Sequence, residues 1–147
     1  MTAIFEPDCE ADLKEAFFAH AGSGYFVEVG ANHPHQLSQT WHLEQRGWDG
    51  ILVEPQPELA AALRRQRLAK VYAVACASPQ QAGKMMSLHL AGIHSSLDPY
   101  LNISTIRPQG SVEVAVTTLD GQPVGSGRPG ALWRRMHQLS EAYWNPA

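Results

Sequence analysis

The stretch GYFVEVGANHPHQLSQTWHLEQRGWDGILVEP, residues 24–55, decides the fold. Near its ends it reads YFVEV (25–29) and ILV (51–53), short runs of aromatic and β-branched residues that are typical of buried strands. Between them SQTWHLEQR (38–46) predicts a helix, and Gly47 is placed to end that helix in the left-handed conformation. Strand, helix and strand in this order predict a parallel βαβ unit.

The next segment repeats this pattern. Pro57 occupies a favourable first helical position before the strong helix formers of ELAAALRRQR (58–67), and KVYAVA (70–75) predicts a third strand. Apolar strands joined by helices indicate a parallel sheet flanked by helices, and right-handed crossovers then require the spatial order three, two, one. We therefore expect an α/β, Rossmann-like fold.

The second half of the chain has a different character. KMMSLHLAG (84–92) and SVEVAVTTLD (111–120) alternate apolar and polar residues, as half-exposed strands do, and could pair as a hairpin or extend the edge of the sheet. The segment between them predicts a loop. Residues 121–130 are rich in glycine and proline and predict a linker, residues 132–143 predict a terminal helix, and residues 8–17 predict a leading helix.

Composition excludes several classes of function. The chain has 147 residues, a length that suits one domain. Its net charge of -3 argues against binding to the phosphate backbone of nucleic acids, and Arg64, Arg65 and Arg67 fit a solvated helix face. The acidic start lacks the features of a secretory signal, and no apolar run approaches the length of a membrane span, so we expect a cytoplasmic protein. The spacing of Cys9 and Cys76 matches neither a metal site nor a redox motif, so we expect both to be reduced thiols.

A candidate ligand site lies at the first strand-to-helix turn. Ligands of open α/β sheets bind beyond the carboxyl ends of the strands, which places Gly30, Ala31 and Asn32 at the ligand. The turn lacks the G-x-G-x-x-G pattern of a dinucleotide site. A cationic ligand without phosphate fits better, because Glu28 can offset an ammonium or sulfonium and Glu54 can accept hydrogen bonds from ribose hydroxyls. S-adenosylmethionine is such a ligand, and we expect both carboxylates to face one shared cavity.

Five motifs extend this interpretation: FVEVGAN, LEQRGWDGILVEPQPEL, AVACASP, GIHSSLD and VTTLD. Together they resemble the FkbM-type S-adenosylmethionine-dependent methyltransferases over about residues 24–120. The resemblance implies a class I methyltransferase fold and O-methylation of a hydroxyl group on a sugar or small metabolite. It also implies cofactor contacts of three kinds: a first motif at Glu28, Gly30, Ala31 and Asn32, a ribose site at Glu54 and Pro55, and an adenine border at Ala75, Cys76, Ala77 and Ser78.

The chain departs from the family pattern after Asp120. In the family a short helix, a strand ending in an acidic motif and the remaining strands follow, and none of these is present here. We therefore expect a truncated methyltransferase domain over residues 1–120 and an atypical tail over residues 121–147. The first strand would be left with an open edge that the terminal helix or another subunit must cover, so we expect a homo-oligomer or a marginally stable monomer. The alternative is a catalytically degenerate S-adenosylmethionine-binding module or an oligomerising module.

Histidines offer two further candidates. His33, His35 and His42 lie close together in sequence, but the proline and the helix start between them disfavour a metal site. His94, in the segment GIHSSLD, has a suitable intrinsic pKa to act as general base toward the hydroxyl of a small acceptor. We therefore predict no metal and name His94 as the candidate catalytic residue.

Overall fold

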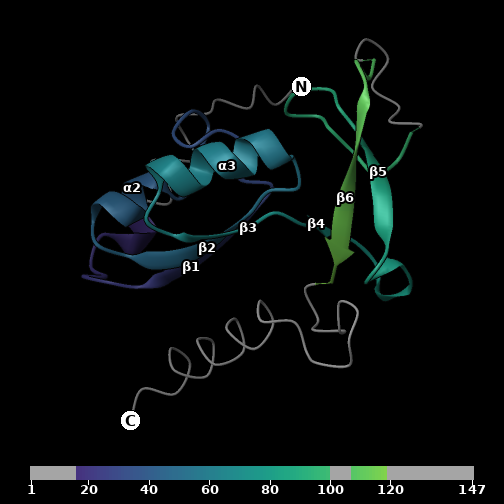
Figure 1. Ribbon diagram of the computed structural model, residues 1–147. Coiled ribbons are helices and arrows are strands. Elements are labelled where there is room, and N and C mark those ends of the chain that lie inside the picture. Colours follow the sequence, from purple (N-terminus) through teal and green to yellow (C-terminus); the bar gives the residue numbers. More distant parts are fainter. Residues whose placement is uncertain (1–15, 100–106, 119–147) are drawn as a thin grey trace, which may run out of the picture.

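The computed structural model describes residues 16–99 and 107–118 (Figure 1). Of the predicted leading helix only residues 16 and 17 fall within these ranges, and they belong to a helical segment that ends at residue 18. The predicted linker, the terminal helix and the whole tail over residues 121–147 lie outside the described residues. In the two described ranges, no helix combines the length and the apolar character needed to cross a membrane.

A parallel sheet with helices on one face forms the first layer pair (Figure 1). Its strands are β1 (Tyr25–Val29), β2 (Asp49–Val53) and β3 (Lys70–Tyr72), in the order β1-β2-β3. The crossovers are α2 (Trp41–Gln45) and α3 (Pro57–Gln66), with Pro57 at the start of α3 as predicted. The predicted α/β architecture, the parallel pairing and the order of the three strands are confirmed.

Alternation along the strands builds two cores. Phe26 and Leu52 face the helices and pack with Leu63 of α3, whereas Ile51 and Val53 point to the opposite face. Leu52, Leu63 and Ile51 are completely buried, and such burial contributes about 1.5–3 kcal/mol for each side chain. Glu28 and Glu54 have the same parity as Phe26 and Leu52. Strand alternation therefore directs Glu28 toward the helix side of the sheet.

Two glycines admit aromatic rings to the helix-side core. A Cβ atom built on Gly50 would lie 2.3 Å from the ring of Phe26, its partner in the β1–β2 register, and one on Gly24 would lie 2.3 Å from the ring of Trp48. Real Cβ atoms do not approach other atoms so closely. The rings thus fill the space that a side chain would need, and glycine is required at both positions by packing rather than by backbone conformation.

The predicted third strand over residues 70–75 is wrong in its extent. β3 ends at Tyr72 because its register partner Val53 is the last residue of β2. After two residues the chain enters β4 (Ala75–Cys76), which pairs in parallel with β6 (Ser111–Thr117). One continuous apolar run therefore serves two sheets, which the run itself does not reveal.

The second sheet has the order β4-β6-β5. β5 (Met85–His89) and β6 pair antiparallel over five residues of each strand, so the predicted pairing of the two alternating segments is confirmed. Leu88, Val114 and Val116 form its core together with Ala75. β1 is an edge strand of the first sheet within the described residues, and the homo-oligomer expected from that edge stays a prediction.

The first crossover helix is shorter than predicted at its start. Residues 38–46 were expected to be helical, but α2 begins at Trp41. The hydroxyl of Ser38 accepts hydrogen bonds from the amides of Thr40 and Trp41 and donates one to the Glu28 carboxylate, which holds residues 38–40 in a turn before the helix, whose N-cap is Thr40. Gly47 has a φ of 84°, which confirms the predicted left-handed ending.

Candidate functional site

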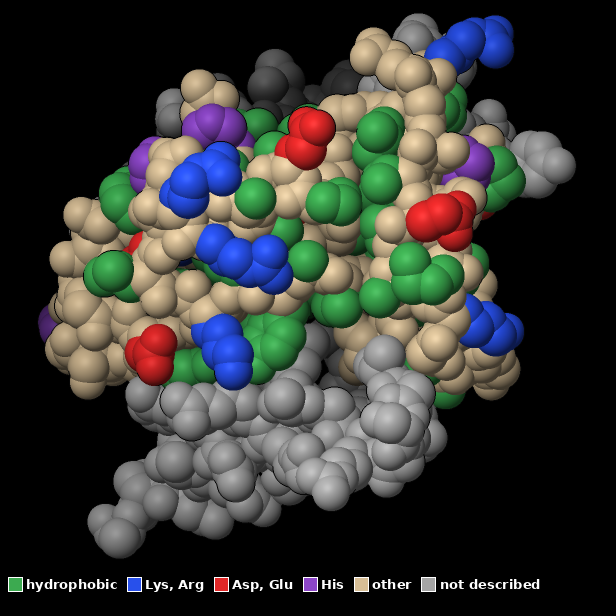
Figure 2. Space-filling view, in the orientation of Figure 1, with side chains coloured by type: hydrophobic (Ala, Val, Ile, Leu, Met, Phe, Trp, Pro, Cys, Tyr) green, Lys and Arg blue, Asp and Glu red, His purple; other side chains and the backbone are tan. Residues whose placement is uncertain are grey.

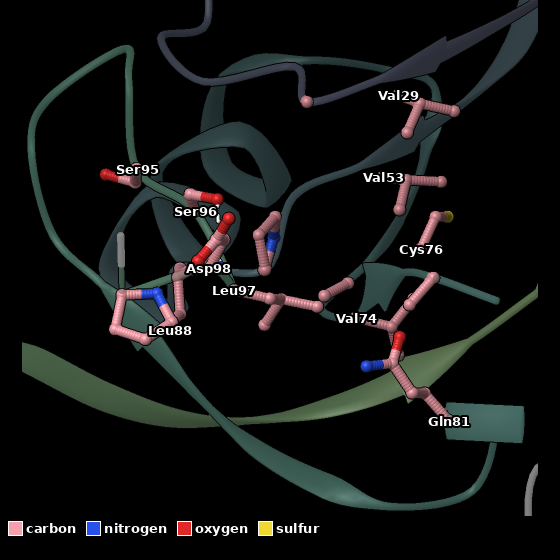
Figure 3. A pocket seen from close by; sticks show the side chains of 15 residues that line it. Val29, Val53, Val74, Cys76, Gln81, Leu88, Ser95, Ser96, Leu97 and Asp98 are labelled. Atoms are coloured by element: carbon pink, nitrogen blue, oxygen red, sulfur yellow. Dashed lines mark hydrogen bonds between the residues drawn. The ribbon is translucent and has the colours of Figure 1, made fainter. Parts of the chain in front are cut away.

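A cavity of about 690 Å³ lies at the carboxyl ends of the parallel strands. This volume is within the range of small-molecule and cofactor sites. Its walls come from both sheets and from the loop after β5 (Figure 3). The lining residues are 29–30, Val53, Pro55, 74–77, Gln81, Leu88 and 95–99.

Half of the predicted cofactor contacts meet at this cavity. Gly30, Pro55, Ala75, Cys76 and Ala77 line it, although they come from three separate segments of the chain. The other predicted contacts are not among its lining residues: Glu28, Ala31, Asn32, Glu54 and Ser78. The predicted contacts are thus divided between the cavity lining and the residues around it, and the two predicted carboxylates do not share the cavity.

Two residues of the turn after β1 have a left-handed backbone. Gly30 and Asn32 have positive φ angles of 77° and 53°, in the left-handed region. The amides of Gly30 and Ala31 both donate to the carbonyl of Val53, at 2.8 and 3.1 Å, which ties the turn to the end of β2. Ala31 is buried in the helix-side core, so it anchors the turn to that core and does not line the cavity.

Glu54 bridges the ends of the first two strands. Its Oε2 accepts a hydrogen bond from the Asn32 amide and its Oε1 accepts one from the Gln56 amide, both at 2.8 Å. The residue is 2% exposed, and desolvation by burial raises the pKa of Glu54 above its ordinary value, because it outweighs the two backbone hydrogen bonds that favour the charged form. The predicted ribose role stays a prediction; the carboxylate stands beside Pro55, which lines the cavity.

Glu28 organises the chain before α2. Its carboxylate accepts hydrogen bonds from the Ser38 hydroxyl at 3.2 Å, from the Gln39 amide at 3.0 Å and from the Thr40 hydroxyl. The residue is 8% exposed. A carboxylate with donors on both oxygens in a buried position has a structural use in this turn, in addition to the cofactor role that the resemblance implies.

Arg67 completes a buried network below this turn, and its predicted solvated position is wrong. Its guanidinium donates to Glu44 at 2.6 Å, to the Pro34 carbonyl at 3.0 Å, and to the hydroxyls of Ser38 and Thr40. Both side chains of the Arg67–Glu44 pair are almost fully buried. Sequence reasoning missed this pair because Arg67 follows α3 instead of continuing its exposed face.

The other two arginines of that segment are exposed, as predicted. Arg64 and Arg65 lie in the last turn of α3, and Figure 2 shows basic side chains over the first sheet and its helices. The lining of the cavity is different, since the part of it that the structure describes contains no lysine, arginine or histidine. The basic surface and the cavity are thus chemically distinct parts of the molecule.

The loop after β5 supplies the polar wall of the cavity. Ser95, Ser96 and Asp98 line it, and Figure 3 shows Ser96 beside Asp98, with Val29 and Val53 across the cavity. Ser96 is anchored to β5 by two backbone hydrogen bonds with His89, at 2.8 and 3.0 Å. His94 is not among the lining residues, so the structure does not bring the candidate base to the cavity, and its catalytic role stays a prediction.

Cys76 and Ser78 lie on the cavity wall and just outside it. Cys76 is a free thiol on the cavity wall, and burial raises its pKa, so the protonated thiol dominates at neutral pH. Ser78 is exposed and its hydroxyl donates to Gln81 at 3.3 Å, just outside the lining. The described residues contain no group of three or more metal-ligating side chains.

Comparison of the chain with family models, with characterised proteins and with solved structures gives no match. The geometry of the cavity and its chemistry therefore carry the functional argument alone.

Proposed function

We propose that the chain binds S-adenosylmethionine and belongs to the functional class of cytoplasmic O-methyltransferases acting on a small hydroxylated acceptor. One observation carries the proposal: five of the residues expected at the cofactor from sequence line one cavity at the carboxyl edge of the parallel sheet. That edge is where open α/β sheets bind their ligands. The truncated Rossmann-like methyltransferase fold is part of this proposal.

The charge of the cavity supports a ligand without phosphates. Within the described ranges 16–99 and 107–118, Asp98 is the only charged residue that lines it, and these ranges place no basic side chain there to neutralise a phosphate. The apolar side chains of Val29, Val53 and Val74 offer a surface for a nucleobase. A cationic nucleoside fits this combination better than a nucleotide does.

The residues of the chain have clear tasks in this proposal. When bound, S-adenosylmethionine would supply an activated methyl group for in-line transfer to a hydroxyl oxygen. The glycine at position 30 permits close approach of the ligand, and Glu54 fixes the turn through Asn32. Catalysis would then depend on holding donor and acceptor in line, with a base needed to accept the hydroxyl proton.

A binding module without turnover is the second candidate. It is favoured by the position of His94, which is not among the residues that line the cavity. Among the lining residues for which the structure gives a position, Asp98 alone has an ionisable carboxylate or imidazole. Formation of S-adenosylhomocysteine from S-adenosylmethionine in the presence of a panel of sugars would distinguish the enzyme from the binding module.

Calorimetric titration of the full chain with S-adenosylhomocysteine tests the proposal directly. We expect saturable binding at one site, and at least about tenfold weaker binding after Glu54→Ala, because two buried amides lose their acceptor and the turn loosens. Glu58→Ala, an exposed carboxylate on α3, is the matched control and should bind like the wild type. Absence of binding by the wild-type chain would refute the proposal.

A further inference from the structure

We propose that Asp98 provides the carboxylate that attracts the ammonium group at the amino-acid end of the ligand, a role for which the sequence pointed to Glu28. This inference rests on the proposed function, since it assigns a contact within the same cavity. It adds a binding residue from the loop after β5, a segment in which only His94 was singled out from sequence.

Glu28 is poorly placed for the electrostatic role. Both of its carboxylate oxygens accept hydrogen bonds from the turn before α2, and the side chain is almost completely buried. Strand alternation points it toward the helices, and it is not among the lining residues of the cavity. A ligand in the cavity would meet Val29 and Gly30 from this strand instead.

Glu54 is committed in a similar way. Each of its carboxylate oxygens accepts a backbone amide, from Asn32 or from Gln56, and these bonds hold the turn that borders the cavity. It too is absent from the lining. Using either glutamate to attract a cation at the centre of the site would require the turn to rearrange.

Asp98 differs from the two glutamates in its position. It lines the cavity, and among the described residues of the lining it alone carries a charge. Its amide donates to the Ser96 hydroxyl at 3.0 Å, and Ser96 pairs with His89 at the end of β5, so the loop holds this residue at the cavity. Figure 3 shows its carboxylate beside Ser96, on the side of the cavity that faces Val29 and Val53.

The division of the cavity into two regions gives the ligand a direction. Val53, Val74 and Leu97 form an apolar surface that suits the base, while the exposed position of Asp98 leaves a charged group in contact with water. An ammonium next to an exposed carboxylate keeps much of its hydration and still gains attraction. The amino-acid end of S-adenosylmethionine would therefore lie toward the loop after β5.

Two available ligands test this contact separately from the rest of the site. S-adenosylhomocysteine carries the ammonium group, whereas 5′-methylthioadenosine has the same nucleoside and lacks the amino acid. For Asp98→Asn in the full chain, we expect the affinity for S-adenosylhomocysteine to fall about fivefold and the affinity for 5′-methylthioadenosine to change less than about twofold. Glu58→Gln is the matched control and should alter neither affinity.

Each outcome of this titration decides a question. Unchanged affinity of Asp98→Asn for S-adenosylhomocysteine overturns the inference, and so does an equal loss for both ligands, because that would reveal a structural role of Asp98 in the loop. A wild-type chain that binds neither ligand refutes the proposed function itself. If the inference is correct, added salt will weaken binding of S-adenosylhomocysteine more in the wild type than in Asp98→Asn.

Discussion

At the scale of the residue, the acidic side chains of the first βαβ unit act first on the protein's own backbone. Glu28 and Glu54 were predicted from their positions on consecutive strands, and both lie at the expected strand ends. Their hydrogen-bond partners could not be predicted from the sequence. Ser38 bonds to Glu28 and Asn32 bonds to Glu54 through turns, and hydrophobic periodicity does not reveal the geometry of a turn. Arg67 was misplaced because its buried partner, Glu44, is 23 residues away.

Replacement of Arg67 tests the buried network. Arg67→Met should lower the free energy of unfolding by about 3–5 kcal/mol, because Glu44 would be left buried without its cationic partner. Arg65→Met, an exposed neighbour on α3, should change it by less than about 0.5 kcal/mol. Urea unfolding followed by far-ultraviolet circular dichroism measures both values. Equal stability of the two variants would show that the ion pair contributes nothing.

The raised pKa of Glu54 predicts a pH dependence of stability with a definite sign. Burial raises this pKa above its ordinary value of 4.5, so the folded chain holds the proton to higher pH than the unfolded chain does. The stabilising contribution of the protonated carboxyl is therefore complete below about 4.5 and is lost as the pH rises through the folded-state pKa. Glu54→Gln removes this titration while keeping a side chain of similar size.

The measurement is urea unfolding of the wild type and Glu54→Gln at a series of pH values. We expect the unfolding free energy of the wild type, taken relative to the variant, to be constant below pH 4.5, to fall as the pH rises through the raised folded-state pKa, and to level off above it. A difference that grows with pH would mean that the hydrogen bonds from Asn32 and Gln56 outweigh desolvation.

At the scale of the element, hydrophobic periodicity and turn residues predicted which helices and strands form, whereas side-chain contacts determine where each of them begins and ends. Strands β1 and β2 were expected from apolar runs bounded by glycine and proline, and they occur at those positions. The start of α2 shifted because Ser38 bonds to Glu28, and the third strand divided because β2 has no residue left to pair with it. Neither contact is local in the sequence.

Gly50 provides a test of the packing that joins the first two strands. Gly50→Ala should destabilise the fold by about 1–3 kcal/mol, because the new methyl group would meet the buried ring of Phe26 at 2.3 Å. Gly22→Ala has no atom within 4 Å of the added Cβ and should change stability by less than about 0.5 kcal/mol. Thermal unfolding of the two variants compares them, and a tolerated alanine at position 50 would show that the ring moves at little cost.

At the scale of the whole molecule, the cavity belongs to both sheets. Gly30 and Pro55 reach it from the first sheet, Ala75 and Leu88 from the second, and the Gln56 side chain donates to the Ser95 hydroxyl at 3.4 Å across the two parts. Sequence reasoning predicted the first half of this site from the βαβ unit. It could not predict the wall at 95–99, because that wall depends on the pairing of β5 with β6 and of His89 with Ser96.

Cys76 reports on this shared cavity, because it lies on the short strand that leads from one sheet to the other. In a Cys9→Ser chain it is the only thiol, and burial raises its pKa above the ordinary value of 9.0. Its alkylation by iodoacetamide should therefore be slow at pH 8 and accelerate about tenfold per unit of pH, until the raised pKa is reached.

Saturating S-adenosylhomocysteine should slow this alkylation strongly, because a ligand between the two sheets would cover the thiol. The ligand would also stabilise the folded chain, by about 2.7 kcal/mol at a concentration 100-fold above Kd. Alkylation in 8 M urea serves as the control for reagent quality and should be fast with or without ligand. An alkylation rate that is unaffected by ligand, in a chain that binds it calorimetrically, would place the nucleoside outside the cavity and separate the binding activity from this wall of the molecule.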